Sequence, residues 1–188
     1  MSKQVNESKV SSNNNNNNNV PLIVVVGATG SQGGSVIKSL LKLNSNKPQA
    51  SFRIRGITRN TNSDKSKILI SKGIEMIEAD SNDKSSLIKA FTGADYGFLV
   101  TDFWDSNAKL AEDTDYIQGL NLVDAAIEAK LKYIVWSSLH NVENITHGEF
   151  HLPHFTNKNK IEKYIESKSN VISGSFIYAG FYMQNWVM

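Results

Sequence analysis

The chain has the size of one domain, carries almost no net charge and contains no cysteine. Its 188 residues include 20 Lys plus Arg and 18 Asp plus Glu, for a net charge of +2, and 40% are hydrophobic, as in an ordinary globular domain. The lack of cysteine excludes disulfides, thiolate metal sites and a cysteine nucleophile. No basic block indicates nucleic acid, and no apolar run approaches the roughly 18 residues of a membrane span. We expect a soluble intracellular protein, in the cytoplasm or also the nucleus, without nucleic-acid or membrane partners.

The first residues differ in composition from the rest. Residues 13–19 are an unbroken run of asparagine, preceded by other polar residues. Such a segment has too little apolar surface to offset its ordering entropy. We therefore predict a disordered Asn-rich tail over residues 1–20 and one globular domain over residues 21–188. A polar segment that aggregates as β-structure is the alternative.

The globular part alternates strand-like apolar runs with helical patterns. Strands are predicted at residues 22–26, 52–58, 74–79, 96–101, 133–137 and 171–177. Helices are predicted at 35–43, 64–71, 84–91, 110–129 and 156–167, with a loop over 139–153. Regular alternation of this kind indicates an α/β domain with a parallel sheet, and we predict a Rossmann-like, doubly wound architecture.

A glycine-rich turn follows the first predicted strand. It reads Gly27-Ala28-Thr29-Gly30-Ser31-Gln32-Gly33-Gly34, a G-x-x-G-x-x-G spacing. Glycines permit a tight turn and close approach of the backbone to a pyrophosphate, and the next helix directs its N–H groups there. Between a buried strand and a helix, this pattern predicts a dinucleotide site. A turn that serves only the fold is the alternative.

The end of the second predicted strand discriminates between cofactors. An NAD site usually carries an acidic residue there, whereas an arginine accommodates the 2′-phosphate of NADP. This chain has Thr58-Arg59-Asn60, with no acidic residue before Asp64. A guanidinium pairs with phosphate through charge-assisted hydrogen bonds, so Arg59 favours NADP(H). The alternative is a solvated loop arginine.

Two more strand ends nominate site residues by their position. Asp80-Ser81 follows the third predicted strand, and Thr101-Asp102-Phe103 ends the fourth. Ligands of open α/β sheets bind beyond the carboxyl ends of the strands. We expect these residues on the adenine and nicotinamide-ribose sides. A helix N-cap is the alternative role for Asp80.

Taken together, these motifs give the chain a family resemblance. It resembles the NmrA-like family, atypical relatives of the short-chain dehydrogenases, through the glycine turn extended to Val36, Thr58-Arg59-Asn60, Thr101-Asp102-Phe103-Trp104, His154-Phe155 with Lys158, and Tyr182-Met183-Gln184-Asn185. The resemblance implies a doubly wound domain that binds NADP(H). It further implies that the cofactor is lined by Gly27, Ala28, Thr29, Gly30, Ser31, Gln32, Gly33, Arg59, Asp80, Ser81, Thr101, Asp102, Phe103, Lys158, Tyr182, Met183, Gln184 and Asn185.

The chain departs from the family pattern in two places. Members of the family continue beyond the point that corresponds to Met188, so the C-terminal part that would wall the substrate cleft is expected to be missing here. The region of residues 105–114 looks lengthened, and within it Lys109 is a candidate for a cofactor-binding lysine.

The catalytic positions of the short-chain dehydrogenases are only partly present. Those enzymes place a tyrosine four residues before a lysine on one helix, and here the pair is His154 and Lys158. A histidine can transfer protons near neutral pH, yet His154 could instead cap the helix or pack before it. Ser137 stands where relatives often carry a catalytic serine. We expect no metal site at His147, His151 and His154, because no acidic or cysteine fourth ligand accompanies them.

The resemblance and the missing tyrosine together favour a redox-sensing regulator. Such a protein binds NADP(H) and acts through a partner protein whose affinity depends on the bound nucleotide. The alternatives are an NADPH-dependent oxidoreductase of a small carbonyl or aromatic substrate, and a shortened copy that has lost function.

The C-terminal residues are unusually apolar. Residues 176–188 include Phe181, Tyr182 and Trp186 besides six other large apolar side chains. An exposed patch of this kind marks an interface or an aggregation liability. We expect the chain to be dimeric, partner-bound or poorly soluble. The alternative is that Tyr182 and Trp186 fold back over the nucleotide site.

Overall fold

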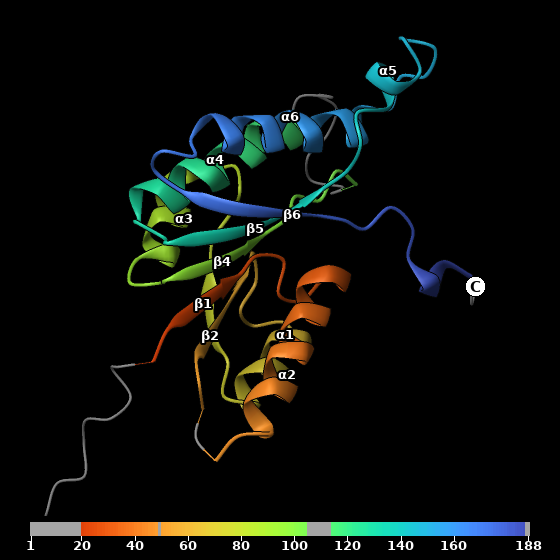
Figure 1. Ribbon diagram of the computed structural model, residues 1–188. Helices are drawn as coiled ribbons and strands as arrows, with labels where there is room; N and C mark the ends of the chain where they lie inside the picture. The colour runs from red at the N-terminus through yellow and green to blue at the C-terminus, as the bar shows by residue number, and fades with distance from the viewer. Residues whose placement is uncertain (1–19, 49, 105–113, 187–188) are drawn as a thin grey trace, which may run out of the picture.

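Six parallel strands form the central sheet of the protein (Figure 1). The structure, a computed structural model, describes residues 20–48, 50–104 and 114–186. The strand order is β3-β2-β1-β4-β5-β6, and every neighbouring pair is parallel. The strands are β1 (Leu22–Val25), β2 (Arg53–Thr58), β3 (Glu75–Glu78), β4 (Tyr96–Leu99), β5 (Tyr133–Ser138) and β6 (Ser173–Tyr178). This order is the doubly wound arrangement predicted from the sequence.

Helices cover both faces of the sheet (Figure 1). On one side lie α1 (Ser31–Ser45) and α2 (Asp64–Ser71); on the other lie α3 (Lys84–Phe91), α4 (Thr114–Glu128) and α6 (Pro153–Ser167). A single-turn helix, α5 (Val142–Ile145), and a short 3-10 helix (Met183–Trp186) complete the described elements. No described helix is both long and apolar enough to cross a bilayer.

The larger part of the core lies between the sheet and the layer of α3, α4 and α6. Trp136 of β5 is the largest fully buried side chain of this core. Leu122 of α4 and Ile161 of α6 belong to the same cluster. A smaller cluster around Val25 and Ile37 packs α1 against the strands. Burial on two faces explains why the strands are nearly continuous apolar runs.

Helix boundaries correct the sequence-based expectations where glycine and proline were taken as breaks. Helix α1 begins at Ser31 and not at residue 35, so Gly33 and Gly34 belong to the helix. Helix α6 begins at Pro153 and not at residue 156, because proline is tolerated at the first helical position. The predicted loop over 139–153 contains α5, which Asn141 caps by accepting from the N–H of Asn144.

Several predictions concern residues that the structure does not describe. They are the Asn-rich tail, the lengthened region with Lys109, and the last two residues of the chain. The predicted helix over 110–129 is described from Thr114 and runs to Glu128.

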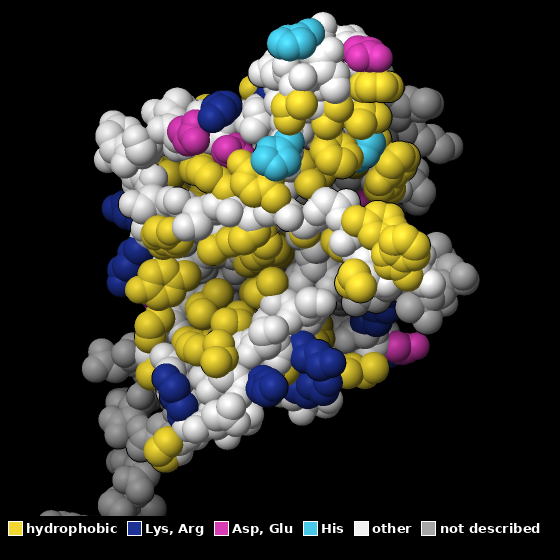
Figure 2. Space-filling view, turned by 45° about the vertical axis from the view of Figure 1, so that its right-hand side comes forward, with side chains coloured by type: hydrophobic (Ala, Val, Ile, Leu, Met, Phe, Trp, Pro, Cys, Tyr) yellow, Lys and Arg dark blue, Asp and Glu magenta, His cyan; other side chains and the backbone are white. Residues whose placement is uncertain are grey.

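The face of the sheet that carries α1 and α2 is covered only in part. Tyr96, Tyr133 and Ile177 on β4, β5 and β6 are between 36% and 41% exposed. Space-filling colours show hydrophobic side chains gathered across this side of the molecule (Figure 2). Beyond β6, Phe181 and Trp186 are 62% and 75% exposed and contact each other edge to face. Trp186 therefore stays exposed, contrary to the alternative that it folds back and is covered.

Gly33 is predicted to be the least replaceable residue of the first helix. A Cβ at Gly33 would lie 2.3 Å from the carbonyl oxygen of Gly27, whereas a Cβ at Gly34 would meet only ordinary contacts, the closest at 3.5 Å. Gly33→Ala should therefore destabilise the fold by about 1–3 kcal/mol, the usual cost of overpacking. The matched control Gly34→Ala should stabilise it by up to about 1 kcal/mol through helix propensity. Urea denaturation checks both values, and equal effects would contradict the packing account.

Candidate functional site

The turn between β1 and α1 lies at the centre of the candidate site. It sits where the strand order reverses, between β1 and β4, which is the usual ligand position of an open α/β sheet. Gly27 has a φ of +64°, which glycine adopts readily, and its carbonyl oxygen accepts from the N–H of Gly30 at 2.9 Å. Gly30 is the N-cap of α1, and no described side chain caps this end. The backbone N–H groups of the first turn therefore face an open space.

Two clefts flank this turn and share part of their walls. Gly27, Gly30, Val100 and Asp102 border both of them. The first cleft has a volume of about 420 Å³ and is further lined by Ser31, Gln32, Gly33, Thr101, Phe103, Trp104, Ser137, Leu139, His154, Phe155, Lys158, Ala179, Gly180, Tyr182 and Asn185. The second is further lined by Val26, Thr29, Ile57, Thr58, Arg59, Asn60, Ser63, Lys65, Ala79, Asp80, Ser81 and Gln118. The clefts are thus two ends of one site that crosses the glycine turn.

Gln32 links three elements inside the first cleft. Its amide oxygen accepts from the hydroxyl of Ser137 on β5 at 2.6 Å, and its amide nitrogen donates to the hydroxyl of Tyr182 at 2.5 Å. Tyr182 thereby closes over the glycine turn, as one sequence-based alternative proposed for it. The bridge presents two hydroxyl groups to the cleft from opposite sides.

Lys158 projects from α6 into the same cleft. Its side chain is 8% exposed, and its ammonium donates to the carbonyl oxygen and the hydroxyl of Thr101 at 3.0 and 2.8 Å. Burial lowers the pKa of Lys158, while the carboxylates of Asp115 and Asp102 oppose that shift. The lysine is thus fixed beside the end of β4.

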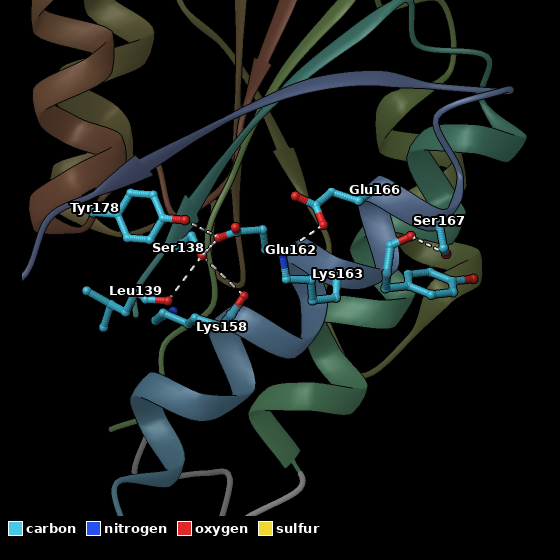
Figure 3. Close-up of polar contacts among 9 residues, drawn as sticks. Ser138, Leu139, Lys158, Glu162, Lys163, Glu166, Ser167 and Tyr178 are labelled. Carbon is cyan, nitrogen blue, oxygen red and sulfur yellow. Dashed lines mark hydrogen bonds and ion pairs between the residues drawn. The ribbon is translucent and has the colours of Figure 1, made fainter. Parts of the chain in front are cut away.

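A polar network, buried except at Tyr178, holds the backbone of α6 behind Lys158 (Figure 3). The indole N–H of Trp136 donates to the carbonyl oxygen of Lys158 at 2.9 Å. One turn later, the carboxylate of Glu162 accepts from Ser138 at 2.5 Å and from Tyr178 at 2.6 Å. Burial and the bond to Glu162 raise the pKa of Tyr178 to about 12. These contacts tie α6 to β5 and β6 and so determine the position of Lys158.

His154 lies in the first turn of α6 and not before the helix. Leu152 is the N-cap, so the alternative that His154 caps the helix or packs before it is wrong; the residue packs from within the helix. Its ring lies 5.2 Å from that of Phe103 and 5.4 Å from that of Trp104, between ring centroids. Burial is the main cause that lowers the pKa of His154. The imidazole therefore favours its neutral form, which is a weak proton donor.

The loop histidines do not converge. The ring of His151 contacts the carboxylate of Glu143, whereas His154 packs among aromatic rings. Across the described ranges, no group of three His, Asp or Glu side chains could hold a metal ion.

The second cleft contains Arg59 at the end of β2. The loop that carries it is stiffened by polar contacts, since Asn60 accepts from the N–H of Asn62 at 2.9 Å through its side chain and from the hydroxyl of Ser66 at 2.8 Å through its carbonyl. Arg59 itself is exposed and lines the cleft together with Lys65. Two cations thus line this end of the site, together with the carboxylates of Asp80 and Asp102.

Asp80 does not cap a helix. The N-cap of α3 is Asp83, which accepts from the N–H groups of Ser85 and Ser86 at 3.0 and 3.2 Å, and the side-chain bond from Ser85 lowers the pKa of Asp83. Asp80 instead accepts from the N–H of Asn82 at 2.8 Å and lines the second cleft. The alternative role for Asp80 as a cap is wrong.

A few predicted residues lie elsewhere. Ala28 is packed in the core at 1% exposure, and Met183 is 75% exposed; neither lines a cleft. The structure does not describe the side chain of Gln184. Other lining residues were missed, among them Lys65 and Gln118. Lys65 and Gln118 belong to no ligand-binding motif in the sequence, and only the packing of their helices brings them to the second cleft.

Comparison with known proteins agrees with this arrangement. The NmrA-like family matches residues 20–188. The chain belongs to the NmrA-like family. It is 36% identical to an NmrA-like family domain-containing oxidoreductase of Aspergillus hancockii, over 86% of this chain and 47% of the relative. The chain thus spans about half the length of the relatives it matches.

Solved structures place the NmrA-like chain among known folds. The triphenylmethane reductase of Citrobacter, solved as a complex with NADP(H), is 27% identical, with a TM-score of 0.69 over 87% of this chain and 51% of that one. NmrA, a negative transcriptional regulator, has a TM-score of 0.69 over 88% of this chain and 47% of its own, at 23% identity. The second likeness shows the fold alone.

His154 should make the stability of this NmrA-like domain sensitive to acid. Because burial lowers its pKa in the folded state, the unfolded chain binds the proton more readily. Stability should be complete above the ordinary histidine pKa and fall as the pH drops from there through the folded pKa. His154→Phe should lose part of this dependence, measured by urea denaturation at about pH 8 and about pH 5.

The control for this prediction is His147→Asn. His147 is exposed and has a φ of +51°, a conformation that asparagine tolerates, and this variant retains His154. It should keep the wild-type acid sensitivity. The account of His154 is wrong if His154→Phe and wild type lose stability equally on acidification.

Proposed function

We propose that the chain binds NADP(H) across the glycine turn. The observation that carries the proposal is the pair of clefts that meet at Gly27 and Gly30, with Arg59 at one end and Lys158 at the other. A cation in each cleft suits a ligand that carries phosphates. Similarity to a reductase solved with NADP(H) supports the same ligand.

The residues present fit this cofactor. Gly33 lets α1 pack directly on the end of β1, where a Cβ would lie 2.3 Å from the carbonyl oxygen of Gly27, and the uncapped end of α1 directs N–H groups to the clefts. Arg59 in the second cleft supplies the cation that a 2′-phosphate requires, while Lys158 and Thr101 lie in the first cleft beside the nicotinamide-ribose end. When bound, the cofactor would supply hydride chemistry there.

Arg59 is expected to determine the choice between NADP and NAD. Arg59→Ala should weaken NADP binding by about 1.5–3 kcal/mol, the scale of a hydrogen bond to a charged group. NAD affinity should barely change, because NAD has no 2′-phosphate. Titration calorimetry with each nucleotide measures both effects, and Arg53→Ala on the exposed start of β2 is the control. Equal losses for the two nucleotides would remove Arg59 from this role.

We further propose that the domain is a redox-sensing regulator whose bound nucleotide alters its affinity for a partner protein. The lowered pKa of His154 supports this role, since a neutral imidazole packed among Phe103 and Trp104 is a poor substitute for a tyrosine acid. The exposed rings of Phe181 and Trp186 beside the cleft offer a surface on which a partner could detect the nucleotide.

The second candidate is an NADPH-dependent oxidoreductase of a small carbonyl or aromatic compound. Two observations favour it: similar proteins are named oxidoreductases, and the hydroxyls of Ser137 and Tyr182 face the first cleft through Gln32. Aromatic side chains at Phe103, Trp104 and Phe155 would suit a flat substrate.

Turnover measurements separate the two candidates. Under the regulator proposal the domain binds NADPH without turnover, and Lys158→Met should weaken that binding, as it should for an oxidoreductase, whereas Lys163→Met on the exposed face of α6 should not. The absence of turnover is what distinguishes the regulator. The regulator proposal therefore predicts no steady NADPH consumption with a panel of quinones and aldehydes, followed at the absorbance band of NADPH. Consumption that His154→Phe abolishes would favour the oxidoreductase.

A further inference from the structure

Asp115 is a buried acidic residue without an evident structural purpose. It lies in the first turn of α4 and is 4% exposed. Neither of its carboxylate oxygens has a hydrogen-bond partner within the described residues, and the hydroxyl of Thr156 on α6 is also without one. Native proteins rarely leave such groups unpaired, because burial then costs their full desolvation. A buried carboxylate retained without hydrogen bonds calls for an electrostatic explanation.

The packing of α4 on α6 places Asp115 beside the lysine of the first cleft. The two helices touch closely at Gly119, where a Cβ would lie 2.5 Å from the side chain of Ile161. Both helices follow parallel strands on the same face of the sheet, so they run in the same direction (Figure 1). Asp115 lies one turn before Gly119, and Lys158 lies about one turn before Ile161. Asp115 and Lys158 therefore lie at the same level of the helix pair, without a direct ion pair between them.

Other charged groups around Lys158 are less suited to balance its charge. Asp102 follows β4 and is exposed to solvent. Glu162, one turn further along α6, already accepts from Ser138 and Tyr178. His154, one turn before Lys158, carries no negative charge, and the carboxylate of Asp115 also acts to raise its pKa against the effect of burial. Burial lowers the pKa of Lys158, and among the groups that raise it Asp115 has a larger effect than Asp102.

We propose that Asp115 is a positioning residue that supplies the buried counter-charge for Lys158. Through it the chain keeps the ammonium of Lys158 charged although the residue is only 8% exposed. The carboxylate makes no hydrogen bond of its own with Lys158, so the ammonium is left to donate to Thr101 and to a ligand oxygen. The effect of Asp115 on ligand binding rests on the proposed binding of NADP(H).

Titration of Lys158 itself tests the inference without any nucleotide. The ¹³Cε chemical shift of Lys158 in the full chain is followed against pH and assigned by its loss in Lys158→Met. Asp115→Asn should move the titration midpoint of Lys158 downward, because the ammonium loses its counter-charge. Glu128→Gln, at the exposed end of the same helix, should leave the midpoint unchanged. An unchanged midpoint in a folded Asp115→Asn variant would overturn the proposal.

A second measurement needs no variant of Asp115 and so does not depend on its folding. A buried pair is screened little by salt, whereas an exposed charge is screened within roughly 10 Å at 0.1 M. The Lys158 midpoint of the wild type should therefore stay constant as salt is raised. A midpoint that falls with salt would assign the charge balance to the exposed Asp102 and contradict the role of Asp115.

Measurements of NADPH binding distinguish this inference from the proposed function. Asp115→Asn should weaken NADPH binding by about tenfold on the alkaline side, the scale of one lost charge-assisted hydrogen bond, and less at lower pH. Failure of wild type to bind NADPH would overturn the proposed function, while the Lys158 titration would still test the inference. Wild-type NADPH binding with an identical pH profile in Asp115→Asn would overturn the inference alone.

Discussion

The close approach of Gly33 to the carbonyl of Gly27 is the constraint on which the rest of the site depends. It brings the first turn of α1 against the end of β1, where no side chain separates helix from strand. The two clefts exist because this contact keeps the turn tight and its backbone exposed. Gln32 on the same turn then reaches both Ser137 and Tyr182. One backbone contact thus fixes both the cradle and the walls of the first cleft.

Two buried carboxylates in the layer of α4 and α6 differ in their hydrogen bonding. Glu162 satisfies its burial through hydrogen bonds from Ser138 and Tyr178 (Figure 3), whereas Asp115 has none among the described residues. Buried and fully bonded, Glu162 serves the fold by tying α6 to the sheet. Asp115 is buried without hydrogen bonds, so under our proposal the charge of Lys158 offsets its desolvation. The two acidic residues of this helix layer thus differ in how their burial is balanced.

Sequence patterns predicted the architecture well because burial on both faces of a parallel sheet leaves long apolar runs. The glycine turn, Arg59 and Lys158 could also be predicted as site residues, since each has a chemical reason to occupy its place after a strand or on a helix. Helix starts at Ser31 and Pro153 were missed because local propensity treats glycine and proline as breaks. Asp115 was missed because only the packing of α4 on α6 makes its carboxylate unusual.

The central claim is that the clefts on both sides of the glycine turn form one NADP(H) site. The most direct measurement is the thermal unfolding temperature of the chain with equal concentrations of NADPH, NADP, NADH and NAD. A ligand that binds only the folded state raises this temperature according to its affinity. The account predicts a clear rise with NADPH and NADP and a much smaller one with NADH and NAD. No rise with any nucleotide, or an equal rise with all four, would contradict it.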